Sequence, residues 1–252
     1  MAAEQAQKVA WITGGGSGIG KALAFALNQQ GWQVVISGRT EQKLQAVAEQ
    51  GNSIAYWILD VTDKERHQQV FDEICEHYGI PSLIILNAGD YTPMSLSEFD
   101  IDLIYKLNEV NYLGVMNGLA SVLPTLQSQQ SGQILLMSSV AGYRGLPDAG
   151  PYGATKAALI NFAESLHLPL KQQGVLLRIV NPGFVTTPLT AQNSFKMPAE
   201  ITAEEAANRI LASLNSDSFE ITFPKRFTYF LKLFRCLPYR LYFFLINKIT
   251  GK

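Results

Sequence analysis

Cysteine and histidine are scarce in this sequence, with two cysteines and three histidines among 252 residues. Cys75 and Cys236 do not form a metal-binding pair, and His67, His77 and His167 have no partner at ligand spacing, so we expect no bound metal. We expect the three histidines to be exposed or half-buried on helices. Two thiols in a chain of this length are typical of a reducing compartment. The sequence therefore predicts a cytoplasmic protein without a disulfide framework.

Long apolar segments are also absent. The longest, residues 241–246, is far shorter than the roughly 20 residues that a membrane-spanning helix needs. The first seven residues are polar and include Glu4, which is unlike a signal peptide. Hydrophobic residues make up 47% of the chain and charged residues 16%, so general disorder is excluded. The net charge of −1 also excludes a strongly basic nucleic-acid-binding protein.

Acidic residues are missing from the last 32 residues, although the rest of the chain is acidic. Residues 221–252 contain seven basic residues and nine of the 26 aromatic residues, and their net charge is +7, against −8 for residues 1–220. We predict two helices here, separated by Pro238, the second at 239–249. The apolar face of the first comprises Phe227, Phe230, Leu231, Phe234 and Leu237, and the opposite face comprises Thr228, Lys232 and Arg235.

This composition leaves two interpretations of the tail open. An aromatic face backed by cations suits the surface of an anionic membrane, which predicts a peripheral contact on its cytoplasmic face through residues 225–252. Alternatively, the tail packs on the oppositely charged body or across a dimer, where it covers the active site. We expect a catalytic domain at 1–224 and a helical extension at 225–252.

Short, branched apolar runs alternate with longer segments of helical periodicity along the body. Repeated βα units of this kind predict a Rossmann-type α/β fold, a doubly wound parallel sheet of about seven strands with helices on both faces. Ligands of such sheets bind at the carboxyl ends of the strands. The predicted strands are 8–13, 33–37, 53–59, 82–87, 133–139, 175–181 and 219–223, and the predicted helices are 18–30, 41–50, 63–78, 97–127, 151–173 and 201–214.

A glycine-rich run follows the first predicted strand and leads into a helix. Glycines let the backbone approach a pyrophosphate closely, and the helix N-terminus supplies N–H donors. The spacing is G-x-x-x-G-x-G rather than the more usual G-x-G-x-x-G. The strand before and the helix after favour a nucleotide-binding loop over a plain turn. Its candidate binding residues are Gly14, Ser17, Gly18, Ile19 and Gly20.

The end of the second predicted strand indicates which cofactor binds. Residues 37–40 read SGRT, with no acid before Glu41 to bind a ribose 2′-hydroxyl and repel a 2′-phosphate. Arg39 can pair with such a phosphate, although a solvated arginine at a helix start is the alternative. The sequence therefore favours NADP(H) over NAD(H). Asp60 and Val61 follow the third strand, where an adenine ring would lie, but Asp60 can equally be an ordinary helix N-cap.

Three side chains form a candidate catalytic group. Tyr152 and Lys156 are four residues apart on one predicted helix, so they lie on the same face. A lysine beside a tyrosine stabilises the phenolate and lowers the tyrosine pKa from about 10, which makes it a usable acid or base. Ser139, at the end of the fifth strand, is placed to hold a substrate oxygen. A surface pair on a helix is the alternative interpretation.

Together these motifs resemble the short-chain dehydrogenase/reductase family in its single-domain form. The resemblance covers about residues 7–190, and the motifs occur in the order and spacing of the family. They comprise residues 13–20, Asn87-Ala88-Gly89, Asn111, Ser139, Tyr152 with Lys156, and 181–183 followed by Thr187.

The resemblance implies a role for each matched residue. Tyr152 would be the general acid/base, and Lys156 would bind the nicotinamide ribose and lower the pKa of that tyrosine. Ser139 would orient the carbonyl, because Ser138 is one residue off the family spacing, and Asn111 would hold a water that relays protons. The residues expected to shape the cofactor site are Asn87, Ala88, Gly89, Pro182, Gly183, Val185 and Thr187.

The implied activity is reduction of a carbonyl by NADPH or the reverse oxidation of an alcohol, with a lipophilic ketone or aldehyde as the expected substrate. The alternatives are a reductase of a compact soluble substrate, with the tail as an oligomer contact, and a non-catalytic NADP-binding sensor. By analogy with the family we expect a homodimer or homotetramer paired through 97–127 and 151–173. Apolar residues expected in the loops, either lining a pocket or packing, are Tyr91, Met94, Tyr143, Phe184, Leu189, Phe195 and Met197.

Overall fold

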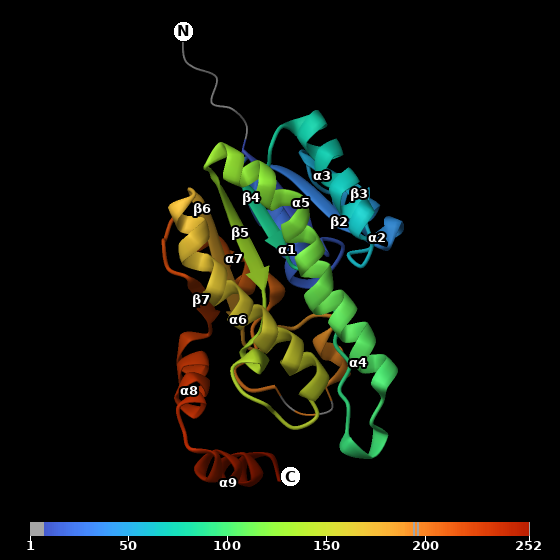
Figure 1. Cartoon of the computed structure of the whole chain (residues 1–252). Coiled ribbons are helices and arrows are strands. Elements are labelled where there is room, and N and C mark those ends of the chain that lie inside the picture. The colour runs from blue at the N-terminus through green and yellow to red at the C-terminus, as the bar shows by residue number, and fades with distance from the viewer. Residues whose placement is uncertain (1–7, 194, 196, 252) are drawn as a thin grey trace.

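Seven parallel strands form one sheet in the order β3-β2-β1-β4-β5-β6-β7, and their carboxyl ends point to the lower end of the molecule in Figure 1. The computed structural model describes residues 8–193, 195 and 197–251. The strand order confirms the predicted doubly wound sheet. Strands are added on one side of β1 as far as β3, and from β4 onward they are added on the other side, so the strand order reverses between β1 and β4. The strands are β1 Val9–Thr13, β2 Gln33–Gly38, β3 Ile54–Ile58, β4 Leu83–Leu86, β5 Gly132–Met137, β6 Val175–Pro182 and β7 Glu220–Phe223.

Helices cover both faces of this sheet. One apolar core lies between the sheet and α1, α2 and α7, and a second lies between the sheet and α3, α5 and α6. All five residues of β1 are buried, as expected for a central strand that is covered on both faces. The helices are α1 Gly18–Gln29, α2 Glu41–Ala48, α3 Lys64–Tyr78, α4 Ile101–Asn108, α5 Gly114–Gln129, α6 Gly150–Gln172, α7 Ala203–Ala212, α8 Lys225–Arg235 and α9 Tyr239–Thr250.

His67 departs from the prediction that the histidines lie on helix surfaces or are half-buried. Its side chain is fully buried beneath α3, and its ring meets that of Trp11 edge to face at 6.0 Å. Burial disfavours the charged imidazolium and lowers the pKa of His67 to about 4. The residue is therefore a neutral member of the core.

The single helix predicted at 97–127 is interrupted. Residues Leu96–Glu98 form a separate 3₁₀ turn, and α4 begins only after Asp100, whose carboxylate accepts hydrogen bonds from the backbone N–H groups of the first turn. A π-helical turn, Glu109–Leu113, then joins α4 to α5. Such turns insert one extra residue, and they frequently occur at functional sites. This turn contains Asn111.

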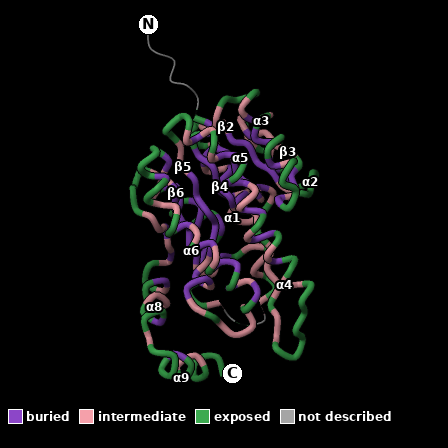
Figure 2. Tube along the Cα trace, in the orientation of Figure 1, coloured by how far each residue is buried: buried purple, intermediate pink, exposed green. Residues whose placement is uncertain are grey.

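The tail forms two helices, as predicted, and none of the described helices is long and apolar enough to cross a bilayer. The predicted faces of α8 are partly wrong. Thr228 is fully buried, whereas Phe230 is 50% exposed. The inner side of α8 faces β7 and the loop after β5, where Lys232 finds an acidic partner in Glu220, so the helix is rotated from the position that apolar spacing alone predicts. Figure 2 shows α9 as a mostly exposed helix.

Candidate active site

The glycine-rich loop has no space for side chains at its two ends. Gly14 has a φ of +71°, and a Cβ there would lie 2.8 Å from the Cα of Ala88. A Cβ on Gly20 would lie 2.4 Å from the carbonyl oxygen of Gly14, a backbone atom that cannot move aside. No side chain therefore covers the backbone at these two positions of the loop that leads into α1. The first N–H groups of that helix have no intrahelical acceptor. This is the arrangement that an anionic pyrophosphate needs.

Thr13, which the sequence analysis included in the glycine-rich motif without a role of its own, ties this loop to the next one. Its hydroxyl accepts hydrogen bonds from the backbone N–H groups of Asn87 (3.0 Å) and Ala88 (3.1 Å). The Asn87 amide in turn donates to the carbonyl oxygens of Thr13 (3.0 Å) and Gly14 (3.3 Å). The loops after β1 and β4 are thereby held together. A hydroxyl residue at the last position of a buried strand was the available signal.

The side chains expected at the adenine end lie at the ends of β2 and β3. Arg39 is exposed, and no hydrogen bond or ion pair joins it to another described residue. Asp60 accepts hydrogen bonds from the backbone N–H (3.0 Å) and hydroxyl (2.9 Å) of Thr62, while the N-cap of α3 is Asp63. Val61 is buried. The alternative that Asp60 is the N-cap is therefore wrong, and Arg39 is free to bind an anion.

Ser139 and Tyr152 meet at the carboxyl end of β5. The Ser139 side chain lies close enough to Tyr152 to act on its pKa, and the Ser139 hydroxyl accepts a hydrogen bond from the N–H of Ala141 (3.1 Å). The neighbouring Ser138 points the other way, because its buried hydroxyl donates to the carbonyl oxygen of Lys156 (3.0 Å). The two adjacent serines thus differ in what they can reach, and only Ser139 contacts the tyrosine.

The ionisation of Tyr152 and Lys156 differs from the sequence expectation. Burial raises the pKa of Tyr152 to about 12, although the Ser139 hydroxyl acts in the lowering direction. Burial lowers the pKa of Lys156 to about 8. The Lys156 ammonium donates to the carbonyl oxygen of Met137 (2.8 Å) and lies 5.5 Å from the centre of the Tyr152 ring. The expected lowering of the tyrosine pKa is therefore wrong for the chain alone, since burial, the largest cause, raises that pKa.

Asn111 is fully buried in the π turn and fixes the loop after β4. Its side-chain oxygen Oδ1 accepts a hydrogen bond from the backbone N–H of Asp90 (2.7 Å). Its side-chain nitrogen Nδ2 donates to the backbone carbonyl oxygen of Asp90 (2.8 Å) and to the Thr155 hydroxyl (3.4 Å). Gly89 lies between this side chain and Lys156, since a Cβ there would be 3.2 Å from Asn111 Oδ1 and 3.6 Å from Lys156 Nζ. The structure therefore brings Asn111, Tyr152, Ser139 and Lys156, here called the catalytic cluster, to one place.

The segment after β6 closes the site from the opposite side. Thr187 lies against the glycine-rich loop, because a Cβ on Gly18 would be 3.2 Å from its methyl group. Gly183 donates its N–H to the carbonyl oxygen of Phe223 (2.7 Å), which joins this segment to β7. Pro182 and Val185 are buried. The candidate cofactor residues from six separate segments thus lie at the carboxyl ends of the strands.

Tyr91 and Tyr143, which the sequence analysis expected either to line a pocket or to pack within the loops, have different surroundings. The Tyr91 ring is 5.0 Å from that of Tyr152, and its hydroxyl donates to Asn193 (2.9 Å), so Tyr91 borders the site. Tyr143 is largely buried and its hydroxyl donates to Glu220, and it also lines a groove shared with Arg144 and the turn between α8 and α9. Phe184 contacts Phe195 on one side and the tail residue Phe227 on the other, at 5.6 and 5.8 Å between ring centres.

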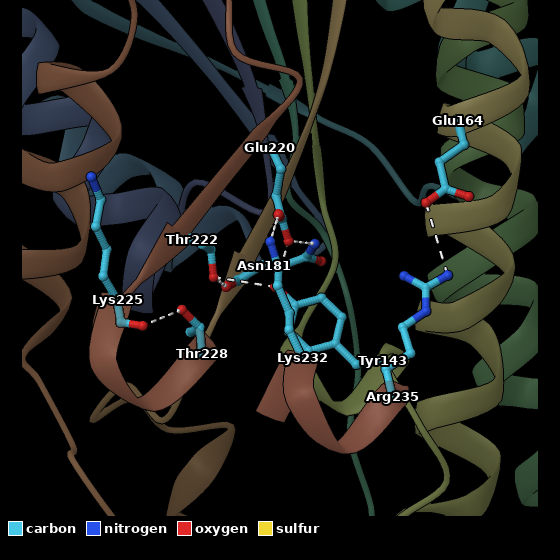
Figure 3. A network of polar contacts seen from close by, with 9 residues as sticks. All are labelled: Tyr143, Glu164, Asn181, Glu220, Thr222, Lys225, Thr228, Lys232 and Arg235. Atoms are coloured by element: carbon cyan, nitrogen blue, oxygen red, sulfur yellow. Dashed lines mark hydrogen bonds and ion pairs between the residues drawn. The ribbon is translucent and has the colours of Figure 1, made fainter. Parts of the chain in front are cut away.

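A second polar group lies behind residues 138–149, the loop between β5 and α6 that is here called the catalytic loop. The sequence analysis missed this group. We call it the strap cluster, and it consists of Tyr143, Asn181, Glu220 and Lys232 (Figure 3). The Glu220 carboxylate forms an ion pair with Lys232 and accepts hydrogen bonds from Tyr143 and from Asn181 (2.7 Å). Burial alone would raise the pKa of Glu220, but these donors outweigh it and lower the pKa. Burial and the contact with Glu220 raise the pKa of Tyr143. The cluster fastens α8 to the sheet.

Arg144 makes the next contact between the catalytic loop and the tail. Its guanidinium donates to the carbonyl oxygens of Phe234 (2.6 Å) and Leu237 (2.7 Å) at the end of α8. It also lies 5.0 and 4.0 Å from the ring centres of Tyr239 and Tyr242 in α9. One side chain, between Ser139 and Tyr152 in the sequence, thus holds both tail helices.

Comparison with known proteins identifies the family. A family model described as short chain dehydrogenase matches residues 8–197. The chain belongs to this family. An uncharacterized oxidoreductase of Staphylococcus epidermidis is 33% identical over 213 residues, which cover 84% of this chain and 93% of that protein.

Two solved structures relate this short-chain dehydrogenase to cofactor complexes. ElxO with NADP bound is 25% identical, with a TM-score of 0.77 over 86% of this chain and 97% of that one. A short-chain dehydrogenase/reductase from Burkholderia phymatum in complex with NAD is 24% identical, with a TM-score of 0.83 over 92% and 94%. As a short-chain dehydrogenase, the chain is an oxidoreductase that uses a nicotinamide cofactor. The backbone of its glycine-rich loop, which no side chain covers at Gly14 and Gly20, and the start of α1 fit the pyrophosphate of such a cofactor.

Proposed function

We propose that the protein reduces a lipophilic ketone or aldehyde with NADPH, with Tyr152 as the proton donor. The observation that carries this proposal is the pair formed by Ser139 and Tyr152 at the sheet edge. The pKa of Tyr152, raised to about 12 by burial, keeps its hydroxyl protonated at neutral pH. A protonated donor beside a second hydroxyl suits a carbonyl oxygen that gains negative charge.

Each member of the catalytic cluster has a defined task in this proposal. A nicotinamide cofactor held by the residues at the sheet edge would supply the hydride for the carbonyl carbon. Tyr152 transfers its proton to the carbonyl oxygen, which becomes the alcohol, and Ser139 holds that oxygen in place. Lys156, charged below its pKa of about 8, stabilises the phenolate until a proton returns. Asn111 holds the loop after β4 in position through Asp90 and belongs to the proposed relay that resupplies the proton.

The preference for NADP(H) rests on Arg39. This exposed guanidinium has no partner among the described residues, and no acid precedes it at the end of β2. The related structures hold NADP in one case and NAD in another, so the choice depends on the residues of this chain. An unpaired arginine there favours a 2′-phosphate. The other residues proposed to hold the cofactor are Gly14, Ser17, Gly18, Ile19, Gly20, Asp60, Val61, Asn87, Ala88, Gly89, Tyr152, Lys156, Pro182, Gly183, Val185 and Thr187.

The lipophilic substrate class is supported by the surroundings of the catalytic loop. A groove of about 350 Å³ lies between residues 145–147 of this loop and α9, and its walls include Tyr242, Phe243 and Ile246. The ring of Tyr91 lies 5.0 Å from that of Tyr152 and adds an aromatic wall beside the proposed proton donor. Apolar walls of this kind suit an alkyl chain that extends from the reacting carbonyl.

The adjacent serines provide a matched test. We expect Ser139→Ala to lower kcat/KM for NADPH-dependent ketone reduction by about 100-fold, since it removes a group that positions the developing charge. Ser138→Ala, which loses a bond to the Lys156 carbonyl instead, should change kcat/KM by less than about fivefold. Rates should also rise along a series of 2-ketones of increasing chain length. Equal losses in the two serine variants, or rates that are insensitive to chain length, would contradict the proposed site or substrate class respectively.

A further inference from the structure

The tail exposes an unusual share of the apolar surface. Seventeen large apolar side chains are exposed among the described residues, and eight of them lie in α8 and α9. Scattered exposed apolar side chains are normal on proteins, but a concentration within two adjacent helices marks an interaction surface. The eight are Tyr229, Phe230, Leu233, Tyr239, Leu241, Phe243, Phe244 and Ile249.

The outer face of α9 combines these side chains with cations. Tyr242 is the buried residue of this helix and points to the catalytic loop, where its hydroxyl donates to the Gly145 carbonyl. On the opposite side Arg240, Phe244 and Lys248 follow one another at intervals of four residues, so they line one face. All three are exposed.

The charge of this surface is of one sign. Lys225, Arg226, Arg240 and Lys248 are exposed, and none forms an ion pair with another described residue. Residues 221–252 contain no acid that could neutralise them. The surface is therefore complementary to a partner that is both negatively charged and able to accept aromatic side chains. An anionic lipid bilayer has both properties at its headgroup level.

A second segment exposes apolar side chains at the same end of the molecule. Leu96 and Phe99, at the 3₁₀ turn before α4, are 89% and 63% exposed. Figure 1 shows this turn and α9 at the lower end, towards which the carboxyl ends of the strands point. The catalytic loop, which contacts α9 through Arg144 and Gly145, lies at this end too. The apolar side chains of both segments and the basic side chains of the tail thus occur at the end of the molecule that holds the catalytic loop.

We infer that this end of the molecule docks on an anionic lipid bilayer, with α9 lying in the headgroup layer and the active site facing the lipid. The helical extension 225–252 is then the docking element, held against the catalytic loop by Arg144 and the strap cluster. Docking does not depend on the reductase chemistry, and it delivers membrane-dissolved substrates directly to the site.

The test measures co-sedimentation of the full chain with vesicles. We expect binding to vesicles of mixed phosphatidylglycerol and phosphatidylcholine, and at least about tenfold weaker binding to phosphatidylcholine alone, since each interfacial cation contributes about fivefold. Phe244→Ser/Lys248→Gln should weaken binding to the anionic vesicles by at least about tenfold. The matched control is Leu168→Ser/Lys171→Gln in the last turns of α6, at the amino-terminal end of the strands, which should bind within about twofold of the parent.

The outcomes are separable. No co-sedimentation of the parent chain, equal binding to neutral and anionic vesicles, or equal losses in the two double variants would overturn the inference. A lipid-free dimer that dissociates in the Phe244 variant would overturn it too, and would assign the surface to a second copy of the chain. Turnover of a short water-soluble ketone, together with the thermal unfolding curve, confirms that each variant is folded. It also distinguishes a failure of docking from a failure of the proposed reduction.

Discussion

The catalytic cluster and the strap cluster are two buried polar groups at the same edge of one sheet, and they are built in opposite ways. In the strap cluster the Lys232 cation meets the Glu220 carboxylate, and two further donors complete that carboxylate. In the catalytic cluster Lys156 is buried with a backbone carbonyl as its acceptor, and it forms no ion pair with a carboxylate of the described residues. Of these two clusters, the strap cluster pairs its positive charge with a negative charge of the protein, whereas the catalytic cluster does not.

The two clusters also differ in the directions of their pKa shifts. The contacts of Glu220 lower its pKa and so favour its charged form, whereas burial shifts both Tyr152 and Lys156 towards their neutral forms. Buried charge that is paired contributes to holding structure together, whereas buried charge that is left unpaired costs stability and remains available for a ligand. The comparison indicates that the strap cluster is structural and that the catalytic cluster is completed by cofactor and substrate.

The largest effect should come from Lys156→Met. We expect turnover to fall by about 100-fold to 10,000-fold, because proton transfer loses its charge partner. We also expect the free energy of unfolding at pH 7 to rise by about 2 kcal/mol. The folded state lowers the pKa of Lys156 to about 8, so keeping it charged costs stability below that pH, and the cost fades as the pH rises towards 10.5. Thermal and urea unfolding measure the gain.

Tyr152→Phe is the control for this prediction. It should lose turnover to a similar degree while retaining cofactor affinity, because it removes the proton donor and leaves the lysine in place. It should not reproduce the pH-dependent gain in stability. If both variants stabilise the protein equally at pH 7 and at pH 10, the stability cost does not come from the buried lysine charge.

The next largest effect should come from the strap cluster. We expect Glu220→Gln to lower the free energy of unfolding by about 2 kcal/mol at pH 7, since it leaves Lys232 without its partner at a partly exposed site. The contacts lower the pKa of Glu220, so its contribution is present above the ordinary carboxyl range and is lost as the pH falls through the lowered pKa. A double-mutant cycle with Lys232→Met measures the coupling by urea unfolding. A coupling of zero would mean that α8 is held by apolar packing alone.

Arg39 extends the comparison to an exposed cation that lacks a protein partner. Arg39→Ser should raise KM for NADPH by about tenfold to 100-fold, since a charge-assisted hydrogen bond to a phosphate contributes about 1.5–3 kcal/mol. KM for NADH should stay within about twofold. Stability should be unchanged, because the exposed side chain forms no hydrogen bond or ion pair with another described residue. Equal effects on the two cofactors would show that Arg39 does not bind the 2′-phosphate.

The smallest predicted effect is a pH dependence of the parent protein. Lys156 loses its proton near pH 8, so kcat/KM for reduction should be level below that pH and fall about tenfold per unit above it. Tyr152, with a pKa of about 12, stays protonated across this range. Lys156→Arg should remove the break near pH 8 if its remaining activity is measurable. A break that persists in this variant would have to come from another group.

Much of the fold and site was predictable because both depend on local patterns. Apolar runs such as β1 and the glycines of the following loop are read directly from the sequence, since backbone space and burial dictate them. The spacing of Tyr152 and Lys156 on one helix face is equally local. The choice of Ser139 over Ser138 came from the family spacing, and the structure places only Ser139 against the tyrosine.

The parts that sequence reasoning missed depend on contacts between distant segments. Glu220 and Tyr143 are 77 positions apart, and nothing near either residue indicates the other. Thr228 was assigned to the polar side of α8 by its residue type, although the position of β7 turns that side inwards. The pKa of Tyr152 was predicted from the nearby lysine, whereas the depth of burial, which no spacing reveals, decides it.

The π turn at Glu109–Leu113 has a consequence for the way this chain tolerates changes of length. One residue corresponds to about 100° of rotation in a helix. Deleting a single residue from this turn would allow α4 and α5 to merge into one regular helix, and Asn111 would swing away from Asp90 and Thr155. A deletion that simplifies the backbone would thereby dismantle the loop after β4. The number of residues between α4 and α5 therefore matters for function, because it sets the direction in which Asn111 points.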